Sequence, residues 1–376
     1  MRLPSQSAKK RTGLPTSAQE LLLTAALGDA ESALSAWNLW RQQHELNNLD
    51  NDSLRLLPLV GYNLSKAGIK FPEMAAITAL TRLGWARHKF LFRSISEVAQ
   101  LLTEHRIDFL LTKGLPLALE HYPSSALRPM SDGDILVRLT QFDRAIELLV
   151  NAGWRHASEY MPSPAHHAIP LRNATHQEVD VHRFALGECP FAREDEAFWR
   201  FAVTLSIDGV SALSPNPTDL LFLTCANSVH SPLRWVADAV ILVRGNEIDW
   251  NRFINQARKR KLALVTRNAL SYIEQRYSAG IPSWVLKSLQ AIPVSWLERW
   301  EYEAWDKTSS HSTRLLLRYA AYRRVPGAQH PLGFLNHLRL HGNLNSVAEI
   351  PSWLLRIATQ KPRTFTPETT APTPKH

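Results

Sequence analysis

Residues 131–137 read Ser131-Asp132-Gly133-Asp134-Ile135-Leu136-Val137, and this stretch decides the fold class. Its apolar end predicts a β-strand, in which side chains two residues apart point to the same face. Asp132 and Asp134 would then lie side by side, while Gly133 faces the other side or lets a neighbouring element approach closely. Two adjacent buried carboxylates repel each other unless a cation lies between them. The pair therefore predicts a metal site for Mg²⁺ (or Mn²⁺), which prefers oxygen ligands and keeps positions open for substrate phosphates.

A strand, a turn and a short helix precede this carboxylate pair. The apolar run Ile107–Thr112 predicts a buried strand, Lys113-Gly114 a turn, and Leu115–His121 a helix. The N-terminus of a helix presents free N–H groups and the positive end of the helix dipole, which suit phosphate oxygens. Gly114 permits close backbone approach, and Lys113 or Arg128 supplies positive charge. The turn is therefore a candidate phosphate-binding element.

A third carboxylate follows in a second alternating segment, Glu178-Val179-Asp180-Val181-His182. The alternation predicts a strand in which Val179 and Val181 face the core and Asp180 and His182 face the opposite way. Asp180 would complete a set of three metal-ligating carboxylates, and His182 is a candidate for contact with the substrate. Each element alone is common in proteins without such a site, and it is their order along the chain that indicates function.

Helical patterns flank this unit on both sides. A long amphipathic segment covers about 72–104, and another covers about 233–243. We therefore expect an α+β fold, a small mixed-sheet core with helical regions before and after it. The expected parts are a disordered basic tail (1–16), an N-terminal helical region (17–105), the α/β core (106–215), a C-terminal helical region (216–359) and a disordered tail (360–376).

The net charge of +9 suggests nucleic acid as a partner, but the distribution of the charge weakens that interpretation. The expected tail 1–16 carries four basic residues and no acidic one, and the expected tail 360–376 carries three basic residues and one acidic residue. The tails thus account for +6 of the net charge, which leaves +3 for everything between them. The remaining basic clusters lie in helical patterns and are typical of solvated helix faces. Nucleic acid is thus a possible partner but not the favoured one.

Composition narrows the class of protein further. Hydrophobic residues make up 45% of the chain, the balance of a folded soluble protein, and no apolar run approaches the roughly 18 residues that a membrane span needs. The start of the chain lacks a secretory pattern, and its two cysteines provide neither a disulfide framework nor a closed zinc site. We therefore expect a cytoplasmic location. The G-x-G-x-x-G of a dehydrogenase and the G-x-S-x-G of a hydrolase are missing.

The ordered segments together resemble a known family. The segments that carry the likeness are Leu111–Gly114, Tyr122-Pro123, Arg128, Asp132–Val137 and Glu178–His182. In this order they resemble the uncharacterised nucleotidyltransferase family of bacteria, a distant branch of the polymerase-beta-like nucleotidyltransferases. Weaker likeness extends into the helical flanks, including residues 233–238 and 248–250, so that it covers the chain from about Ser17 to Val265.

The resemblance implies a role for each matching position. Asp132 and Asp134 would bind magnesium and the nucleoside triphosphate, with ATP as the first guess, and Asp180 would complete the metal site and help to deprotonate the attacking hydroxyl. Lys113 and Gly114 stand where better-known relatives have a Gly-Ser pair that holds phosphates. The sequence departs from that pattern, because a leucine follows the glycine and the gap to Asp132 is longer than in minimal relatives.

The resemblance implies transfer of a nucleoside monophosphate to a hydroxyl acceptor, a small molecule or a protein. Two alternatives remain open: a nucleotide-binding or scaffold protein that has lost turnover, and a toxin–antitoxin component that modifies a protein or tRNA. A second acidic run, Glu194-Asp195-Glu196, is typical of a helix start rather than a metal site. Candidates to line the cleft from the helical side are Asn227, His230, Trp235 and Asp238.

Overall fold

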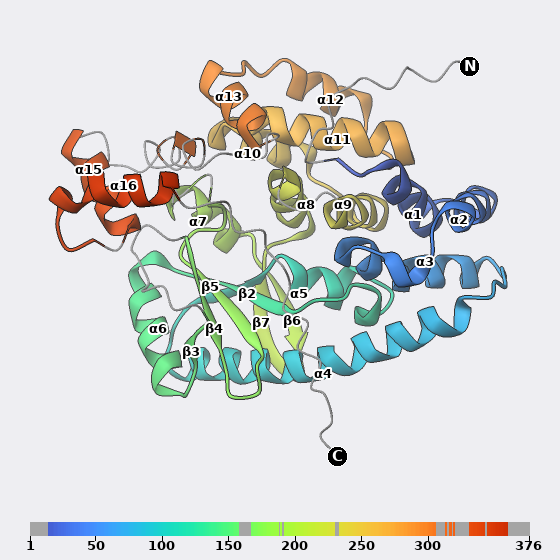
Figure 1. Ribbon diagram of the computed structural model, residues 1–376, viewed down its shortest axis with the longest axis horizontal. Helices are drawn as coiled ribbons and strands as arrows, with labels where there is room; N and C mark the ends of the chain where they lie inside the picture. The colour runs from blue at the N-terminus through green and yellow to red at the C-terminus, as the bar shows by residue number, and fades with distance from the viewer. Residues whose placement is uncertain are drawn as a thin grey trace.

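The protein is an α+β fold built around one mixed seven-stranded sheet (Figure 1). The computed structural model describes residues 14–157, 167–187, 189, 192–229, 233–305, 313, 316, 317, 319, 331–342 and 344–359. The strands follow the order β3-β4-β5-β2-β1-β7-β6. Their bounds are β1 Phe109–Thr112, β2 Asp132–Val137, β3 Arg155–His156, β4 Ala168–Arg172, β5 Glu178–His182, β6 Val203–Ile207 and β7 Val210–Ser214.

Helices precede, interrupt and follow the strands. Those before the sheet are α1 Ser17–Leu27, α2 Ala30–Gln43, α3 Asn51–Lys66 and α4 Met74–Glu104. Those between strands are α5 Gly114–Pro116, α6 Phe142–Asn151 and α7 Ala192–Arg200. Those after the sheet are α8 Pro217–Ala226, α9 Arg234–Gly245, α10 Trp250–Arg260, α11 Ala263–Tyr277, α12 Ser283–Gln290, α13 Trp296–Trp305, α15 Pro331–His341 and α16 Ile350–Thr359. The expected α+β class with helical flanks is confirmed.

One face of the sheet packs on α4 and α6, as Figure 1 shows for the long helix α4 beneath the strands. Leu111, Ile135 and Val181 point to this face and are fully buried against apolar residues of both helices. Gly133 lies on the same face, where a Cβ would stand 2.5 Å from Cδ1 of Ile95 in α4. The glycine between the two aspartates is therefore required by the close approach of α4.

The opposite face is covered by helices from both ends of the chain. Leu110 of β1 and Leu136 of β2 belong to one apolar cluster with residues of α1, α3, α8, α9 and α11. A direct contact joins the two helical regions: the guanidinium of Arg244 in α9 donates a hydrogen bond of 2.7 Å to the carbonyl oxygen of Leu27 in α1. The N- and C-terminal helical regions thus share one core above the sheet.

The strand pair β6–β7 extends the sheet beyond the motifs that the sequence highlighted. Its turn is Asp208-Gly209, and both residues have positive φ, 48° and 84°. An Asp-Gly turn of this kind twists two short antiparallel strands into a hairpin. The pair places β7 parallel to β1, with Leu213 opposite Leu110, and so completes the sheet on that side.

Two expectations concern the ends of the chain and the membrane. No helix among the described residues is both long and apolar enough to cross a bilayer. The expected disordered tails lie outside the described residues, apart from residues 14–16.

Candidate active site

The sheet register places two predicted carboxylates directly beside each other. β2 and β5 run parallel, and Asp134 on β2 is the register partner of Asp180 on β5. Asp132 lies two residues earlier on β2 and therefore points to the same face of the sheet. The alternation predicted for the two segments is confirmed, because Val179 and Val181 are fully buried on the α4 side.

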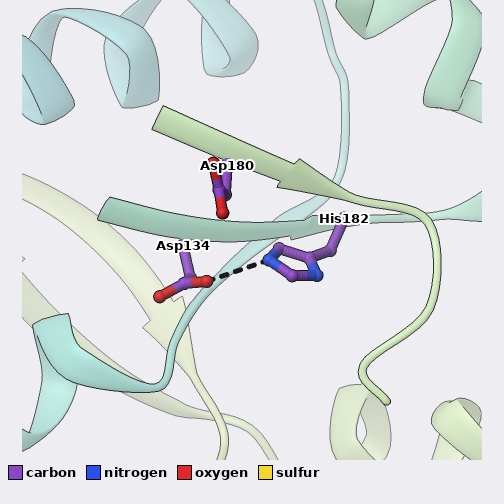
Figure 2. Close-up of side chains that lie close together, drawn as sticks. All are labelled: Asp134, Asp180 and His182. Carbon is purple, nitrogen blue, oxygen red and sulfur yellow. Dashed lines mark hydrogen bonds and ion pairs between the residues drawn. The ribbon is translucent and has the colours of Figure 1, made fainter. Parts of the chain in front are cut away.

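His182 joins this group from the end of β5. The ligand atoms of Asp134, Asp180 and His182 all lie within 4.8 Å of one another (Figure 2). His182 Nε2 lies 2.9 Å from Asp134 Oδ1, and the imidazole is only 1% exposed. The structure thus brings two of the three predicted metal ligands together with a histidine, and Asp132 lies two residues before Asp134 on the same face of β2.

Lys113 reaches into the same group. Its ammonium nitrogen lies 2.6 Å from Asp134 Oδ1 and 3.2 Å from His182 Nε2. The backbone of Lys113 has φ 51° and ψ −112°, a conformation that favours glycine and is strained for lysine. This strained turn between β1 and α5 aims the side chain at Asp134 instead of leaving it free to meet a phosphate.

The pKa values of the three carboxylates shift in different directions, because their surroundings differ. Burial, together with the negative charges of Asp134 and Asp132, raises the pKa of Asp180 to about 7. Burial and the neighbouring Asp134 also raise the pKa of Asp132. Burial alone would raise the pKa of Asp134 as well, but Lys113 and His182 outweigh it and hold that pKa well below its usual value.

These residues fit a divalent cation. Three carboxylates converge on one side of the sheet, and the single ammonium of Lys113 compensates mainly Asp134. Burial and the charges of Asp134 and Asp132 raise the pKa of Asp180, and a bound divalent cation would counteract this rise. Two carboxylate oxygens and one imidazole nitrogen lie close enough to one another to bind a single ion. The oxygens suit Mg²⁺, and all three atoms suit Mn²⁺.

Arg128, a predicted phosphate-binding residue, is held by Asp238 of α9. Its Nε and Nη2 donate hydrogen bonds of 2.8 Å to the two oxygens of that carboxylate. The carboxylate also accepts a hydrogen bond of 2.7 Å from the hydroxyl of Tyr122. A Cβ added at Gly114 would stand 2.6 Å from Nη1 of Arg128. Position 114 therefore has little room for a side chain, because the guanidinium of Arg128 packs against it.

The expected helix over Leu115–His121 is present, but it changes type along its length. α5 covers Gly114–Pro116, and a π-helical turn, Leu117–His121, continues it without a break. So short a helix aligns few peptide dipoles and contributes only a modest positive potential at its N-terminus. Most of the charge available to a phosphate therefore comes from side chains.

The remaining candidates have structural roles where the structure describes them. Asp195 forms a buried ion pair of 2.8 Å with Arg260, so the second acidic run begins α7, as expected, and anchors it to α10. Trp235 is buried in the core formed by the two helical regions. The amide of Asn227 donates to the carbonyl of Leu223. His230 lies outside the described residues.

Comparison with known proteins identifies the family of this chain. The sequence model of a family described as "Uncharacterised nucleotidyltransferase" matches residues 52–278. Among solved structures, the chain resembles an antigenic nucleotidyltransferase-like protein from Paracoccidioides brasiliensis, with 14% identity, a TM-score of 0.37, and coverage of 55% of this chain and 94% of that one. No curated protein matches. Because the matched residues make up more than half of the chain and include Asp132, Asp134 and Asp180, the protein belongs to the uncharacterised nucleotidyltransferase family.

Proposed function

We propose that the protein transfers a nucleoside monophosphate from a nucleoside triphosphate to a hydroxyl acceptor, with a divalent ion at Asp132, Asp134 and Asp180. One observation carries the proposal: Asp134 and Asp180 are register partners on parallel strands, with Asp132 on the same face. This convergence of carboxylates needs a cation, and membership of the family supports phosphoryl-group chemistry.

The proposed reaction exchanges one bond at phosphorus for another. The acceptor oxygen attacks the α-phosphorus, the bond from that phosphorus to the bridging oxygen breaks, and pyrophosphate leaves. Asp180 takes the hydroxyl proton, and Asp132 and Asp134 hold the ion-bound phosphates in line. A divalent ion bound here lowers the pKa of the acceptor hydroxyl and neutralises charge on the leaving group.

His182 and Lys113 have positioning roles in this proposal. His182 contacts Asp134 from the adjacent strand and fixes the direction in which that carboxylate points. Lys113 compensates the charge of Asp134, and in this proposal it turns to a phosphate once an ion takes over that compensation. We further propose that the fold is a distant polymerase-beta-like nucleotidyltransferase, that ATP is the donor, and that the acceptor is a small molecule or a protein.

The proposal is tested with purified full-length protein, each labelled nucleoside triphosphate, and Mg²⁺ or Mn²⁺. Pyrophosphate release and mass spectrometry of candidate acceptors report the transfer. We expect Asp180→Asn and Asp132→Ala to abolish it, whereas Glu147→Gln, which changes an exposed acid of α6, leaves it intact. Transfer that persists in Asp180→Asn at the rate of the unchanged protein would contradict the assignment.

A second candidate function is nucleotide binding without transfer. The contact of Lys113 with both Asp134 and His182 favours it, because the ammonium would compete with a catalytic ion for these two ligands and so hinder transfer. This candidate predicts metal-dependent triphosphate binding with no pyrophosphate release for any acceptor. Release of pyrophosphate that depends on Asp180 excludes it.

A further inference from the structure

Three arginines from separate elements gather beside the carboxylates. Arg55 lies on α3, Arg128 precedes β2, and Arg234 is the first residue of α9. Nη2 of Arg55 contacts the hydroxyl oxygen of Ser131 at 3.5 Å, and that hydroxyl lies 3.4 Å from Oδ1 of Asp132. The arginines therefore adjoin the carboxylates at the Asp132 end of β2.

Two of the guanidinium groups carry buried nitrogens that no described residue satisfies. Nη1 of Arg128 and Nη2 of Arg234 have no hydrogen-bond partner among the residues that the structure describes. Arg128 is only 6% exposed, and its other nitrogens are fixed by Asp238, so Nη1 is held in one position. A buried donor without a partner costs free energy, so a bound group that accepts a hydrogen bond from Nη1 would stabilise the protein.

The charges of this cluster repel one another. Burial, followed by the charges of Arg128 and Arg55, lowers the pKa of Arg234 to about 10. Asp238 offsets one of the three charges through its ion pair with Arg128, and Asp52 offsets part of another. In addition, no described side chain caps the N-terminus of α9, where the helix dipole adds positive potential.

We propose that Arg55, Arg128 and Arg234 form a polyphosphate-binding subsite that holds the β- and γ-phosphates of the nucleoside triphosphate. Guanidinium groups match phosphate oxygens through paired N–H donors, and Nη1 of Arg128 and Nη2 of Arg234 are the donors that remain in the described part of the chain. The subsite rests on the proposed function for the identity of its ligand. It would add side-chain contacts to those that the short helix after Lys113 offers a phosphate.

The family match extends from the α/β core into both helical regions. Arg55 and Arg234 come from the two helical regions, and both lie inside the matched residues 52–278. The α/β core contributes carboxylates, whereas the helical regions contribute two of the three cations. The helical regions would thus complete the binding site as well as cover the sheet.

Inorganic tripolyphosphate tests the subsite without any transfer step. Its binding to full-length protein is measured by calorimetry in EDTA, so that neither metal nor turnover is required. We expect Arg55→Gln and Arg234→Gln each to weaken binding about tenfold, equivalent to about 1.4 kcal/mol. Arg87→Gln, which removes an exposed charge from α4, serves as the matched control and should bind like the unchanged protein.

Thermal unfolding without ligand separates a binding role from a structural one. Because Arg234 is a charge that its neighbours repel, Arg234→Gln should melt at the same temperature as the unchanged protein or higher, while losing tripolyphosphate affinity. A lower melting temperature with unchanged affinity would assign a structural role and overturn the proposal. Equal losses in Arg87→Gln and Arg234→Gln would also overturn it, since they would show nonspecific charge attraction.

Failure of the subsite is distinguishable from failure of the proposed function. Transfer with unaltered tripolyphosphate binding in Arg55→Gln and Arg234→Gln would refute the subsite alone. The expected binding pattern without transfer in any nucleotide assay would retain the subsite and refute the transfer. Absence of tripolyphosphate binding by the unchanged protein would refute the subsite directly.

Discussion

The ammonium of Lys113 lies 2.6 Å from the carboxylate of Asp134, inside the group of ligands that a divalent cation would use. The lysine is fixed there by a strained backbone and by His182 on its other side. An ion bound at Asp134 would compete with this ammonium for the charge of the carboxylate and for the space beside it. We therefore expect metal binding to displace Lys113, which would then be able to meet a phosphate.

Removal of the Lys113 charge should tighten metal binding. Lys113→Met keeps the length of the side chain but ends its competition with the ion, so we expect the Kd for Mn²⁺ to fall about tenfold. Electron paramagnetic resonance of free Mn²⁺ measures it. Lys66→Met, an exposed lysine of α3, is the control. Unchanged or weaker Mn²⁺ binding in Lys113→Met would show that the lysine does not compete.

Breaking the buried ion pair between Arg128 and Asp238 should cost far more stability than breaking an exposed one. Their side chains are 7% and 5% exposed, against 70% and 58% for Arg93 and Glu97. We expect Asp238→Ala to lower the free energy of unfolding by about 3–5 kcal/mol, because it leaves a charge buried and unpaired. Glu97→Gln should cost under about 1 kcal/mol. Urea titration measures both, and similar costs would contradict the prediction.

Replacement of Gly133 by alanine should destabilise the protein, because the added methyl group fits only if the side chain of Ile95 in α4 moves. The Cβ of Gly133→Ala would overlap Ile95, so we expect a loss of about 1–3 kcal/mol in the free energy of unfolding. Ile95→Ala removes the obstructing atoms and leaves a cavity. In the double variant the added methyl should partly fill that cavity, so the two costs should not add. Strictly additive costs would show that Ile95 is not what excludes the methyl group.

Stability should fall with acid through His88. This histidine is 1% exposed, and its Nε2 accepts a hydrogen bond of 2.9 Å from the backbone N–H of Met130. Burial and the charge of Arg128 lower its pKa to about 4. Its unfolded pKa is near 6.5. The unfolded chain therefore binds the proton first, and the histidine contributes stability above pH 6.5 that is lost as the pH falls toward 4.

The slope of stability against pH measures this contribution. Between these pKa values the His88 share of the slope should approach about 1.4 kcal/mol per pH unit. In His88→Gln the amide oxygen can still accept from Met130, but no proton binds, so the free energy of unfolding should depend less on pH over this range. Identical slopes in both proteins would exclude His88 as the source.

Local patterns were sufficient to predict β1, β2 and β5, and the faces of β2 and β5, but β3, β4, β6 and β7 were not predicted. The alternation in Glu178–His182 predicted the observed strand and its buried side, because a side-chain period of two is a property of the extended backbone itself. The same rule placed Asp132 and Asp134 on one face. Asp208-Gly209 is an equally local signal, because an Asp-Gly pair between short strands is typical of the hairpin that β6 and β7 form.

Contacts between distant segments could not be predicted in this way. Arg128 and Asp238 are 110 residues apart, and no local pattern links them, so the sequence alone leaves the arginine free for a phosphate. The same reason applies to Arg55 and Arg234, because each lies in an ordinary amphipathic helix. The aim of Lys113 depends on a backbone conformation that lysine rarely adopts, which composition does not reveal.

The contact between Arg244 and Leu27 joins helices that are 217 residues apart in the sequence. During translation, α1 leaves the ribosome long before α9 exists. It can pack at once on α2 and α3, but the part of its apolar face that contacts α9 must wait for that helix. Nascent or prematurely terminated chains that stop before α9 would expose that face to chaperones and proteases. Quality control would thus remove incomplete chains, so that the carboxylate-bearing face of the sheet is covered only in full-length molecules.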